Sequence, residues 1–301
     1  LPDRLRAGIG EPPPGMEVEV VVEDEPLGTA GAIRFAAEGR VDGPFLALNG
    51  DVLGDADFGA LIAAQRERGA PAVIGLTPVD DPTRFGVVVH DADGVVERFV
   101  EKPPNADGLG PGPWWVNAGA YALDPSVLDL IPADRMVSIE REVFPELVGQ
   151  GLICLRSDGY WRDIGTLESF LSANADAVAG HVRTRLGGAP DAVLIDPSAE
   201  VAPTASLAPP VLVAAGATVG DGAEVGPGVV VGPAATVADR AVVRDAVLLA
   251  GARVCAQAHV ERSAIGTGAL VGERARVVGS ALGTDQAAAA GEELVDERRP
   301  G

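Results

Sequence analysis

The sequence predicts an α/β domain over residues 1–178 and a parallel β-helix over residues 193–283. Strand-like and helix-like segments alternate through the first half, which is typical of α/β folds. In the second half, aliphatic residues recur at every sixth position, a spacing that neither an α-helix nor a flat strand produces. Residues 179–192 have the composition of a linker, and residues 284–301, where the period is lost, are expected to form a loosely held tail.

The composition is ordinary for a globular protein and excludes several other classes. Hydrophobic residues make up 47% of the 301 residues, too many for a disordered chain. No apolar run reaches the ~18 residues that a membrane-spanning helix needs. The net charge of -21 repels nucleic-acid phosphates and anionic membrane surfaces. Two cysteines cannot make a disulfide framework and no signal segment is present, so we expect a cytoplasmic protein with reduced thiols.

The elements of the first half follow from hydrophobic patterning. Strands are predicted at residues 16–23, 45–48, 71–76, 87–89, 95–100 and 116–123, and helices at residues 29–40, 58–68 and 138–148. Thr29 is a plausible N-cap for its helix, and the Asp91–Gly94 turn predicts a hairpin. Because strands alternate with helices, we expect a mostly parallel sheet.

The second half predicts a triangular coil with one short strand on each side. The expected inward residues are Ile195, Val201, Leu207, Val213, Val219, Val225, Val231, Val237, Val243, Leu249 and Cys255, and after a phase slip Ile265, Val271 and Val277. Each aliphatic side chain should stack on the one a full coil away, and the residue four places later is usually small enough for a narrow interior.

Five motifs in the first half carry chemistry. In chain order they are Glu25-Pro-Leu-Gly-Thr-Ala-Gly31, Leu48-Asn-Gly-Asp51, Phe99-Val-Glu-Lys-Pro103, Val116-Asn-Ala-Gly119 and Gly159-Tyr-Trp-Arg-Asp-Ile-Gly-Thr166. Together they resemble the sugar-phosphate nucleotidyltransferases. A sixth segment, Ser138-Ile-Glu-Arg-Glu-Val-Phe-Pro145, resembles the mannose-1-phosphate guanylyltransferases among them.

The resemblance implies a Rossmann-like nucleotidyltransferase core that is incomplete at its N-terminus, followed by a left-handed parallel β-helix. It implies transfer of a nucleotidyl group from a nucleoside triphosphate to a sugar 1-phosphate, with GTP and mannose 1-phosphate preferred and a homo-oligomer expected. Thymidylyl or uridylyl transfer to glucose 1-phosphate is one alternative. A non-catalytic homologue that binds nucleotide sugar and regulates a partner is another.

Two carboxylates are the candidate Mg²⁺ ligands. Asp51 lies just past the carboxyl end of an apolar strand, where α/β sheets bind ligands, and Mg²⁺ prefers hard oxygen ligands. The resemblance implies that Asp163 is the second carboxylate. The competing interpretations are a turn residue for Asp51 and a helix cap for Asp163.

The remaining candidates surround the sugar phosphate. Lys102 is the one lysine among 23 basic residues, which suggests that its position needs a compact ammonium charge. By resemblance, Lys102 contacts the sugar's phosphate and Glu101 accepts hydrogen bonds from sugar hydroxyls. Asn117 and the backbone at Gly86 would complete the sugar pocket by the same resemblance, and Gly28 would let the backbone approach the nucleotide.

One family motif is missing from the 301 residues. The family's Gly-Gly-x-Gly-Thr-Arg-Leu loop cradles the triphosphate with backbone N–H groups, and no Gly-x-Gly-Thr-Arg occurs in this sequence, which begins at Leu1. We therefore expect roughly two strand–helix units of the family's core, ~60–70 residues, to be absent. We also expect these 301 residues alone to show no measurable pyrophosphorolysis.

Overall fold

The computed structural model describes residues 8–9, 12–133 and 135–301, and contacts divide the chain into two units. The first unit comprises the chain up to Gly50 together with Ala56–Gly159, and the second comprises Asp51–Asp55 together with Tyr160–Gly301. The short segment Asp51–Asp55 therefore belongs with the C-terminal unit. Among the described residues, no helix is both long enough and apolar enough to cross a bilayer.

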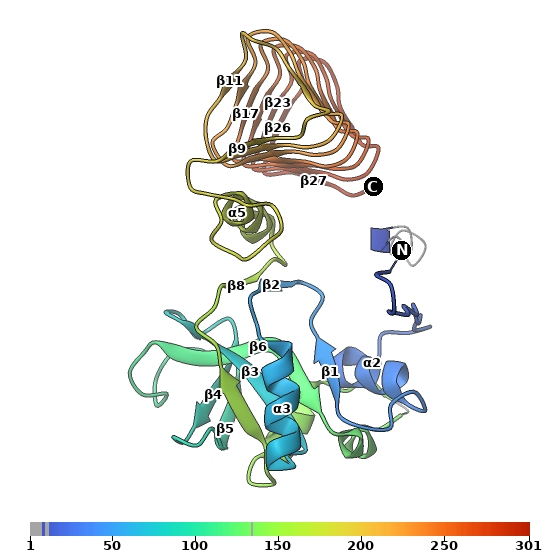
Figure 1. The fold of residues 1–301 in the computed structure, drawn as a ribbon, viewed down its shortest axis with the longest axis vertical. Coiled ribbons are helices and arrows are strands. Elements are labelled where there is room, and N and C mark those ends of the chain that lie inside the picture. Colours follow the sequence, from blue (N-terminus) through green and yellow to red (C-terminus); the bar gives the residue numbers. More distant parts are fainter. Residues whose placement is uncertain (1–7, 10–11, 134) are drawn as a thin grey trace. The chain divides into compact units, whose positions relative to one another are not determined.

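A sheet of six described strands forms the centre of the first unit (Figure 1). Its strands are β1 (Phe45–Leu48), β3 (Ala72–Val79), β4 (Gly86–His90), β5 (Val96–Glu101), β6 (Trp114–Leu123) and β7 (Ile153–Arg156). The order is β5-β4-β6-β3-β7, and β1 also pairs with β6, along residues 120–123. The helical segments of this unit are α2 (Gly28–Ala37), α3 (Phe58–Arg68), η1 (Pro125–Leu130), η2 (Ile139–Val143) and α4 (Phe144–Leu147).

This sheet is mostly antiparallel, so the expectation of a mostly parallel sheet is wrong. Among its described strand pairs, β3 with β7 is parallel, and β6 runs antiparallel to β1, β3 and β4. The strand–helix–strand unit β1–α3–β3 is present, but β6 lies between its two strands. The β4–β5 hairpin adds another antiparallel pair, because a tight turn permits no other direction.

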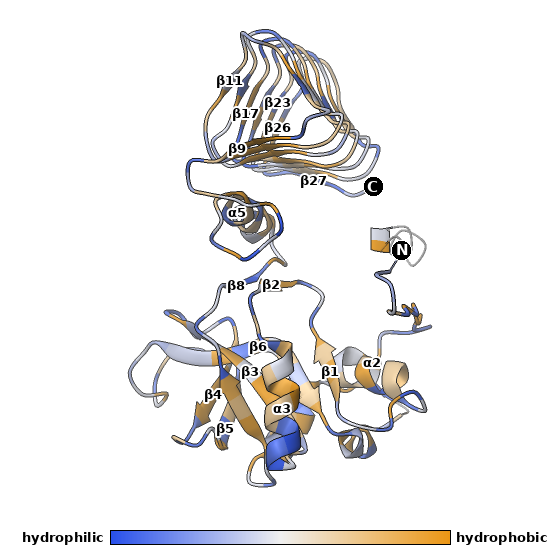
Figure 2. Cartoon of the chain, in the orientation of Figure 1, coloured by the Kyte–Doolittle hydropathy of each residue, from blue (hydrophilic) through white to orange (hydrophobic). Residues whose placement is uncertain are grey.

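The core of the first unit lies along β3 and β6. In Figure 2, β3 and β4 are among the most hydrophobic segments. Ile74 and Leu76 are fully buried. The Phe144 ring meets Tyr121 edge-on at a centroid separation of 5.1 Å and lies 5.5 Å from Phe99. Aromatic pairs at such distances add about 0.5–1.5 kcal/mol beyond the area that they bury. These contacts fix β5 and β6 against α4.

Two local predictions in the first unit are wrong. Residues 16–23 pair with none of the described strands, and Met16 and Val22 are exposed. An alternating segment whose backbone N–H and C=O groups have no ladder partner is not a strand. Thr29 is not an N-cap, since α2 begins at Gly28 with Leu27 before it. Its hydroxyl instead donates to Glu140 and accepts from the Ile139 N–H.

The helix expected at residues 138–148 is real but irregular. Ser138 caps it by accepting from the Arg141 N–H, as helix N-cap residues do. Its first turn, Ile139–Val143, is π-helical, and the Phe144 N–H donates to the Ile139 carbonyl five residues back. Pro145, which has no N–H to donate, lies in the following α-helical turn α4.

The second unit contains the parallel β-helix, whose three sheets form the sides of a triangular coil (Figure 1). The first side is β9 (Val193–Ile195), β12 (Val211–Val213), β15 (Val229–Val231), β18 (Val247–Leu248), β21 (Ala264–Ile265), β24 (Ala281–Leu282) and β27 (Arg298–Arg299). The second is β10 (Glu200–Val201), β13 (Thr218–Val219), β16 (Thr236–Val237), β19 (Arg253–Val254), β22 (Leu270–Val271) and β25 (Ala287–Ala288). The third is β11 (Ser206–Leu207), β14 (Glu224–Val225), β17 (Val242–Arg244), β20 (His259–Glu261), β23 (Arg276–Val278) and β26 (Glu293–Val295).

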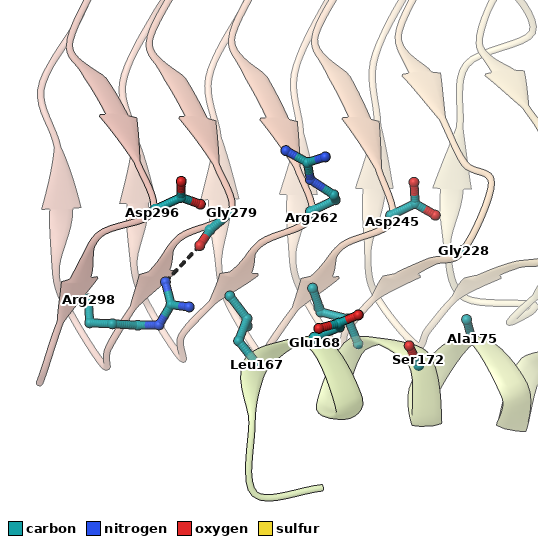
Figure 3. Close-up of a pocket in the computed structure, with 11 residues that line it drawn as sticks. Leu167, Glu168, Ser172, Ala175, Gly228, Asp245, Arg262, Gly279, Asp296 and Arg298 are labelled. Atoms are coloured by element: carbon teal, nitrogen blue, oxygen red, sulfur yellow. Dashed lines mark hydrogen bonds between the residues drawn. The ribbon is translucent and has the colours of Figure 1, made fainter. Parts of the chain in front are cut away.

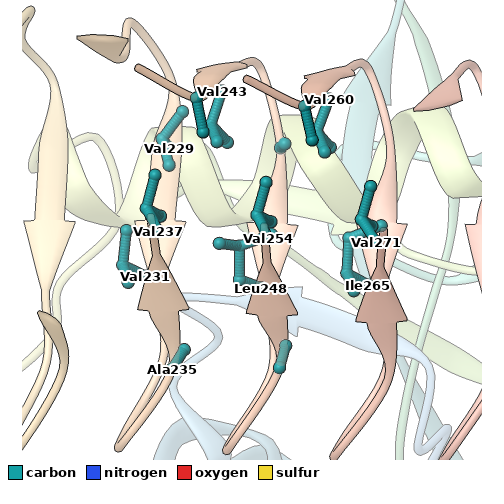
Figure 4. Packing of buried hydrophobic residues seen from close by; sticks show 14 of the residues in the cluster. Val229, Val231, Ala235, Val237, Val243, Leu248, Val254, Val260, Ile265 and Val271 are labelled. Atoms are coloured by element: carbon teal, nitrogen blue, oxygen red, sulfur yellow. The ribbon is translucent and has the colours of Figure 1, made fainter. Parts of the chain in front are cut away.

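The coil changes length part-way, which corrects two predicted inward residues. Val213 pairs with Val231, 18 positions on, whereas Val231 pairs with Leu248, 17 positions on. Val254 likewise takes the inward place predicted for Cys255, and both Leu248 and Val254 are fully buried while Leu249 is 39% exposed. Figure 4 shows the resulting stacks from coil to coil. The coil is shorter because one corner has lost a residue.

The shortened corner is built from residues with left-handed backbone. Asp245, Arg262, Gly279 and Asp296 stand at 17-residue intervals, and each has a positive φ. The same spacing continues past residue 284, where Ala288 and Leu294 are buried in the coil interior. The expectation of a loose tail at residues 284–301 is therefore wrong. Ala288 and Leu294 continue the inward pattern with coils of 17 residues, which a strict six-residue repeat does not detect.

A ribbon and a helix precede the coil within the second unit. Strands β2 (Val52–Gly54) and β8 (Trp161–Asp163) pair antiparallel, and α5 (Leu167–Val178) follows them. Helix α5 packs against β12 and β15, where the outward side chains Leu212 and Val230 are apolar. A groove of about 450 Å³ lies between α5 and the left-handed corner row (Figure 3).

Candidate active site

In the first unit, the β4–β5 hairpin brings three predicted residues together. Gly86 pairs with Glu101 across the two strands, and Lys102 follows directly. The Lys102 Nζ lies 3.9 Å from the Glu101 Oε1. The Lys102 side chain is 60% exposed while that of Glu101 is 19% exposed, so the ammonium is accessible to a ligand and the carboxylate is mostly covered.

Gly86 cannot be replaced without disturbing this group. A Cβ at Gly86 would lie 2.7 Å from Phe99 and 2.8 Å from the Glu101 Oε2. Such separations are well inside van der Waals contact. The absent side chain therefore leaves room for the Glu101 carboxylate and for whatever it binds.

The backbone at Lys102 is strained. Its φ is 44°, in the left-handed region where a non-glycine residue is uncommon. The Lys102 N–H donates to the Phe85 carbonyl at 3.1 Å, which holds this turn at the end of β5. Strained residues cost on the order of 1–3 kcal/mol and cluster at functional sites.

The electrostatics of Glu101 are set by burial and by the helical segment η2. Burial raises the pKa of Glu101 above its ordinary value, and the carboxylate of Glu140 raises it further. The cations Lys102 and Arg141 lower it. Glu140 also accepts hydrogen bonds from the hydroxyls of Thr29 and Ser138, at 2.7 Å each.

Asn117 and Gly28 lie on neighbouring elements of the same unit. The Asn117 side chain donates to the Tyr121 hydroxyl at 2.9 Å and accepts from the Gly119 N–H, so its amide orientation is fixed. A Cβ at Gly28 would lie 2.6 Å from the Val137 carbonyl, and its φ is +75°, so both packing and backbone require glycine. The close approach at Gly28 is therefore to the protein's own backbone.

The two predicted metal ligands meet in the ribbon of the second unit. Val52, next to Asp51, is the register partner of Asp163, and the Ile164 N–H donates to the Asp51 carbonyl at 2.9 Å. The Asp163 Oδ1 accepts from the Gly165 N–H at 2.8 Å. Asp163 is not a helix cap, because Thr166 caps α5 through a capping box with Ser169.

Gly165 adjoins both carboxylates. A Cβ there would lie 3.1 Å from the Asp163 Oδ1 and 3.8 Å from the Asp51 Oδ2. The donor set fits Mg²⁺, which takes one or two protein carboxylates and completes its shell with water and phosphate oxygens. Among the described residues, no group of three or more His, Cys, Asp or Glu side chains is arranged to hold a metal ion. The ribbon thus suits a cation whose remaining ligands are water and phosphate oxygens.

Comparison with known proteins decides the family. The family model described as nucleotidyl transferase matches residues 4–180. The chain belongs to the nucleotidyl transferase family. A second family model, the GMPPB C-terminal domain, matches residues 207–298, within the β-helix. The resemblance found in the motifs is thereby confirmed.

The relatives of this nucleotidyl transferase carry one recurring name. A mannose-1-phosphate guanyltransferase from Candida albicans is 44% identical over 163 residues, 52% of this chain and 43% of that protein. A probable mannose-1-phosphate guanylyltransferase 2 from Arabidopsis thaliana is 38% identical, over 62% of this chain and 53% of that protein. The solved structure of HddC from Yersinia pseudotuberculosis complexed with GMP-PN is 27% identical over 57% of this chain and 72% of that chain, with a TM-score of 0.47. The chain spans about half the length of the curated relatives it matches.

Sequence reasoning missed several residues that shape the site of this nucleotidyl transferase. Glu140 and Thr29 are hydrogen-bonded to each other near Glu101. Both lie inside quoted sequence motifs, but neither was predicted as a site residue. In the ribbon, Tyr160 and Arg162 flank the motif's tryptophan and bond to Asp176 on α5. Side-chain hydrogen bonds between residues far apart in the sequence leave no periodic signal, so only the structure reveals them.

Proposed function

We propose that this chain carries the metal-binding and sugar-phosphate-binding residues of a mannose-1-phosphate guanylyltransferase, which forms GDP-mannose and pyrophosphate from GTP and mannose 1-phosphate. The observation that carries the proposal is that carboxylate oxygens of both Asp163 and Asp51 lie next to Gly165, at 3.1 Å and 3.8 Å from the position that a Cβ would take there. The names of the relatives support the choice of nucleotide and sugar.

The proposed reaction is an in-line displacement at phosphorus. A phosphate oxygen of mannose 1-phosphate attacks the α-phosphorus of GTP, a new P–O bond forms, and the bond to the departing pyrophosphate breaks. No covalent intermediate on the protein is needed, so catalysis consists of positioning and charge neutralisation. Asp51 and Asp163 would hold Mg²⁺, which supplies positive charge to the phosphates when bound.

The residues of the β4–β5 hairpin would bind the sugar phosphate. Lys102 presents an exposed ammonium, which suits a phosphate as a point charge. Glu101, mostly covered and next to the gap at Gly86, would accept hydrogen bonds from sugar hydroxyls. Asn117 would orient the sugar from β6, since its own amide is held by Tyr121 and Gly119. By the family resemblance, the backbone at Gly28 would lie close to the nucleotide.

The proposal is tested by pyrophosphorolysis of GDP-mannose in a polypeptide that joins residues 1–301 to ~60–70 upstream residues with a glycine-rich loop of the family's type. We expect GTP release that depends on Mg²⁺. Replacing Asp51 by Asn keeps the shape and removes the charge, and should lower turnover by at least ~10²-fold. The matched control is Asp80→Asn, which removes an exposed carboxylate just after β3.

A panel of nucleotide sugars separates this proposal from its alternatives. Preference for UDP-glucose or dTDP-glucose would change the substrates and leave the reaction class standing. Normal turnover by the Asp51→Asn variant would remove the metal assignment. Binding of GDP-mannose without any turnover in the loop-bearing polypeptide would favour a regulatory homologue.

A further inference from the structure

We infer that Asp176 on α5 is a positioning residue for Asp163, and that the β-helix unit therefore sets the geometry of the proposed metal site. The inference rests on the proposed function, because it concerns the same pair of carboxylates. Asp163 ends β8, and the residue before it, Arg162, extends its side chain to α5. The position of Asp163 thus depends on where α5 holds β8.

A closed network of charged hydrogen bonds joins β8 to α5. The Arg162 Nη2 donates to the Asp176 Oδ2 at 2.9 Å, and the Arg162 Nε donates to the Tyr160 hydroxyl at 2.9 Å. The Tyr160 hydroxyl donates to the same Asp176 Oδ2 at 2.6 Å. The second oxygen of Asp176 lies 3.1 Å from the His181 Nδ1. One carboxylate therefore gathers three side chains, of which Arg162 lies in β8 and Tyr160 directly precedes that strand.

The side chains of this network are partly shielded from water, which strengthens their charged hydrogen bonds. The Asp176 side chain is 20% exposed and that of Arg162 is 37% exposed. Burial by itself would raise the pKa of Asp176, but the hydrogen bonds from Tyr160 and His181 and the charge of Arg162 lower it below the ordinary 3.8. Charged hydrogen bonds of this kind are roughly twice as strong as neutral ones. The carboxylate is therefore held ionised by the groups that it positions.

Helix α5 is itself anchored on the coil. It packs against β12 and β15, and Leu171 is buried at 9% exposure. In Figure 3, Leu167, Glu168 and Ser172 extend from α5 toward the left-handed corner row of the coil. The contacts accordingly group Asp51–Asp55 and the residues from Tyr160 onward with the β-helix. The coil therefore supports α5, α5 holds β8 through Asp176, and β8 presents Asp163 beside Asp51.

The test measures metal binding directly, with Mn²⁺ alone as the probe. In the ¹⁵N-labelled 301-residue chain, bound Mn²⁺ should broaden the Gly165 amide signal, since Gly165 adjoins both carboxylates. We expect Asp176→Asn to need at least ~10-fold more Mn²⁺ for half-broadening, as is typical when groups that orient metal ligands are removed. Glu224→Gln is the matched control, because it breaks the exposed Arg244–Glu224 ion pair of the coil, at 2.9 Å, and should leave the titration unchanged.

A second variant guards against simple unfolding of α5. Arg162→Lys keeps the charge but cannot bond both Tyr160 and Asp176 from one rigid fork, so an intermediate loss of Mn²⁺ affinity is expected. If Asp51→Asn abolishes the broadening and Asp176→Asn and Arg162→Lys leave it unchanged, the positioning role is wrong and the metal site stands. If Asp51→Asn has no effect, the metal site and the positioning role fall together.

Discussion

The changed length of the coil is tested by moving one carboxyl between adjacent positions. Val254 is fully buried in the stack, and Cys255 beside it is only half-buried. Replacing Val254 by Asp places an unpaired carboxyl in an apolar interior. Protonating a carboxyl of pKa 3.9 at pH 7 costs about 4 kcal/mol, and losing the buried valine costs about 1.5–3 kcal/mol. The sum rivals the whole net stability of a domain, about 5–15 kcal/mol.

The same substitution at Cys255 should cost about 1 kcal/mol or less, as surface changes usually do. Urea unfolding followed by far-ultraviolet circular dichroism measures both variants, because the coil supplies most of the strands. Val225→Asp is the positive reference, since Val225 is 1% exposed in the part of the coil with 18-residue spacing. Loss of the coil in Cys255→Asp together with a stable Val254→Asp variant would show that the strict period of six continues and that the corner is not shortened.

Other consequences concern single residues. Lys102→Arg should weaken binding of mannose 1-phosphate several-fold, measured by titration calorimetry, because the guanidinium differs in shape and reach; equal affinity would make Lys102 a bystander. Gly86→Ala should also weaken that binding, since its Cβ would press on Glu101 and Phe99, and unchanged affinity would contradict the predicted pocket. Burial raises the pKa of Cys154 to about 12, so at pH 8 mass spectrometry should find it alkylated by iodoacetamide only after denaturation. Because the pKa of Asp176 is lowered in the fold, its stabilising contribution is present at neutral pH and disappears as pH falls below 3.8. The difference in melting temperature between the parent chain and Asp176→Asn should therefore shrink to zero in acid, and a difference that persists there would assign it to packing.

The sequence predicted elements well where local patterning alone determines them. β1 and α3 begin and end at the residues expected, and the β4–β5 hairpin follows its turn signal. Strand direction was predicted wrongly, because β6 inserts between β1 and β3 and no local pattern encodes that insertion. The register of the coil failed for a similar reason. An aliphatic residue stands next to the inward one at the shortened corner, so Leu248 and Leu249 could not be told apart by composition.

The candidate site shows the same limit. Asp51 and Asp163 are 112 positions apart, and the motifs paired them only through family resemblance. In the structure Asp163 pairs with Val52, next to Asp51, and oxygens of both carboxylates lie beside Gly165. Glu101 and Lys102 were found because they are adjacent in one motif. Asp176 lay in no motif, and its bonds to Tyr160 and Arg162 depend on the packing of a helix against a strand. Contacts between side chains far apart in the sequence could therefore not be predicted from the sequence.

The solitary lysine has a practical consequence for chemical labelling. Amine-reactive reagents find one side-chain amine in these 301 residues, and it is the exposed ammonium of Lys102. The 22 arginines do not react under the same conditions, so Lys102 is the one side chain of these 301 residues that takes a fluorophore or affinity tag, beside any reaction at an α-amino group. The left-handed backbone at Lys102 then limits where the attached group can point. Acylation there removes the ammonium charge, so labelling also tests whether that charge is needed to bind mannose 1-phosphate.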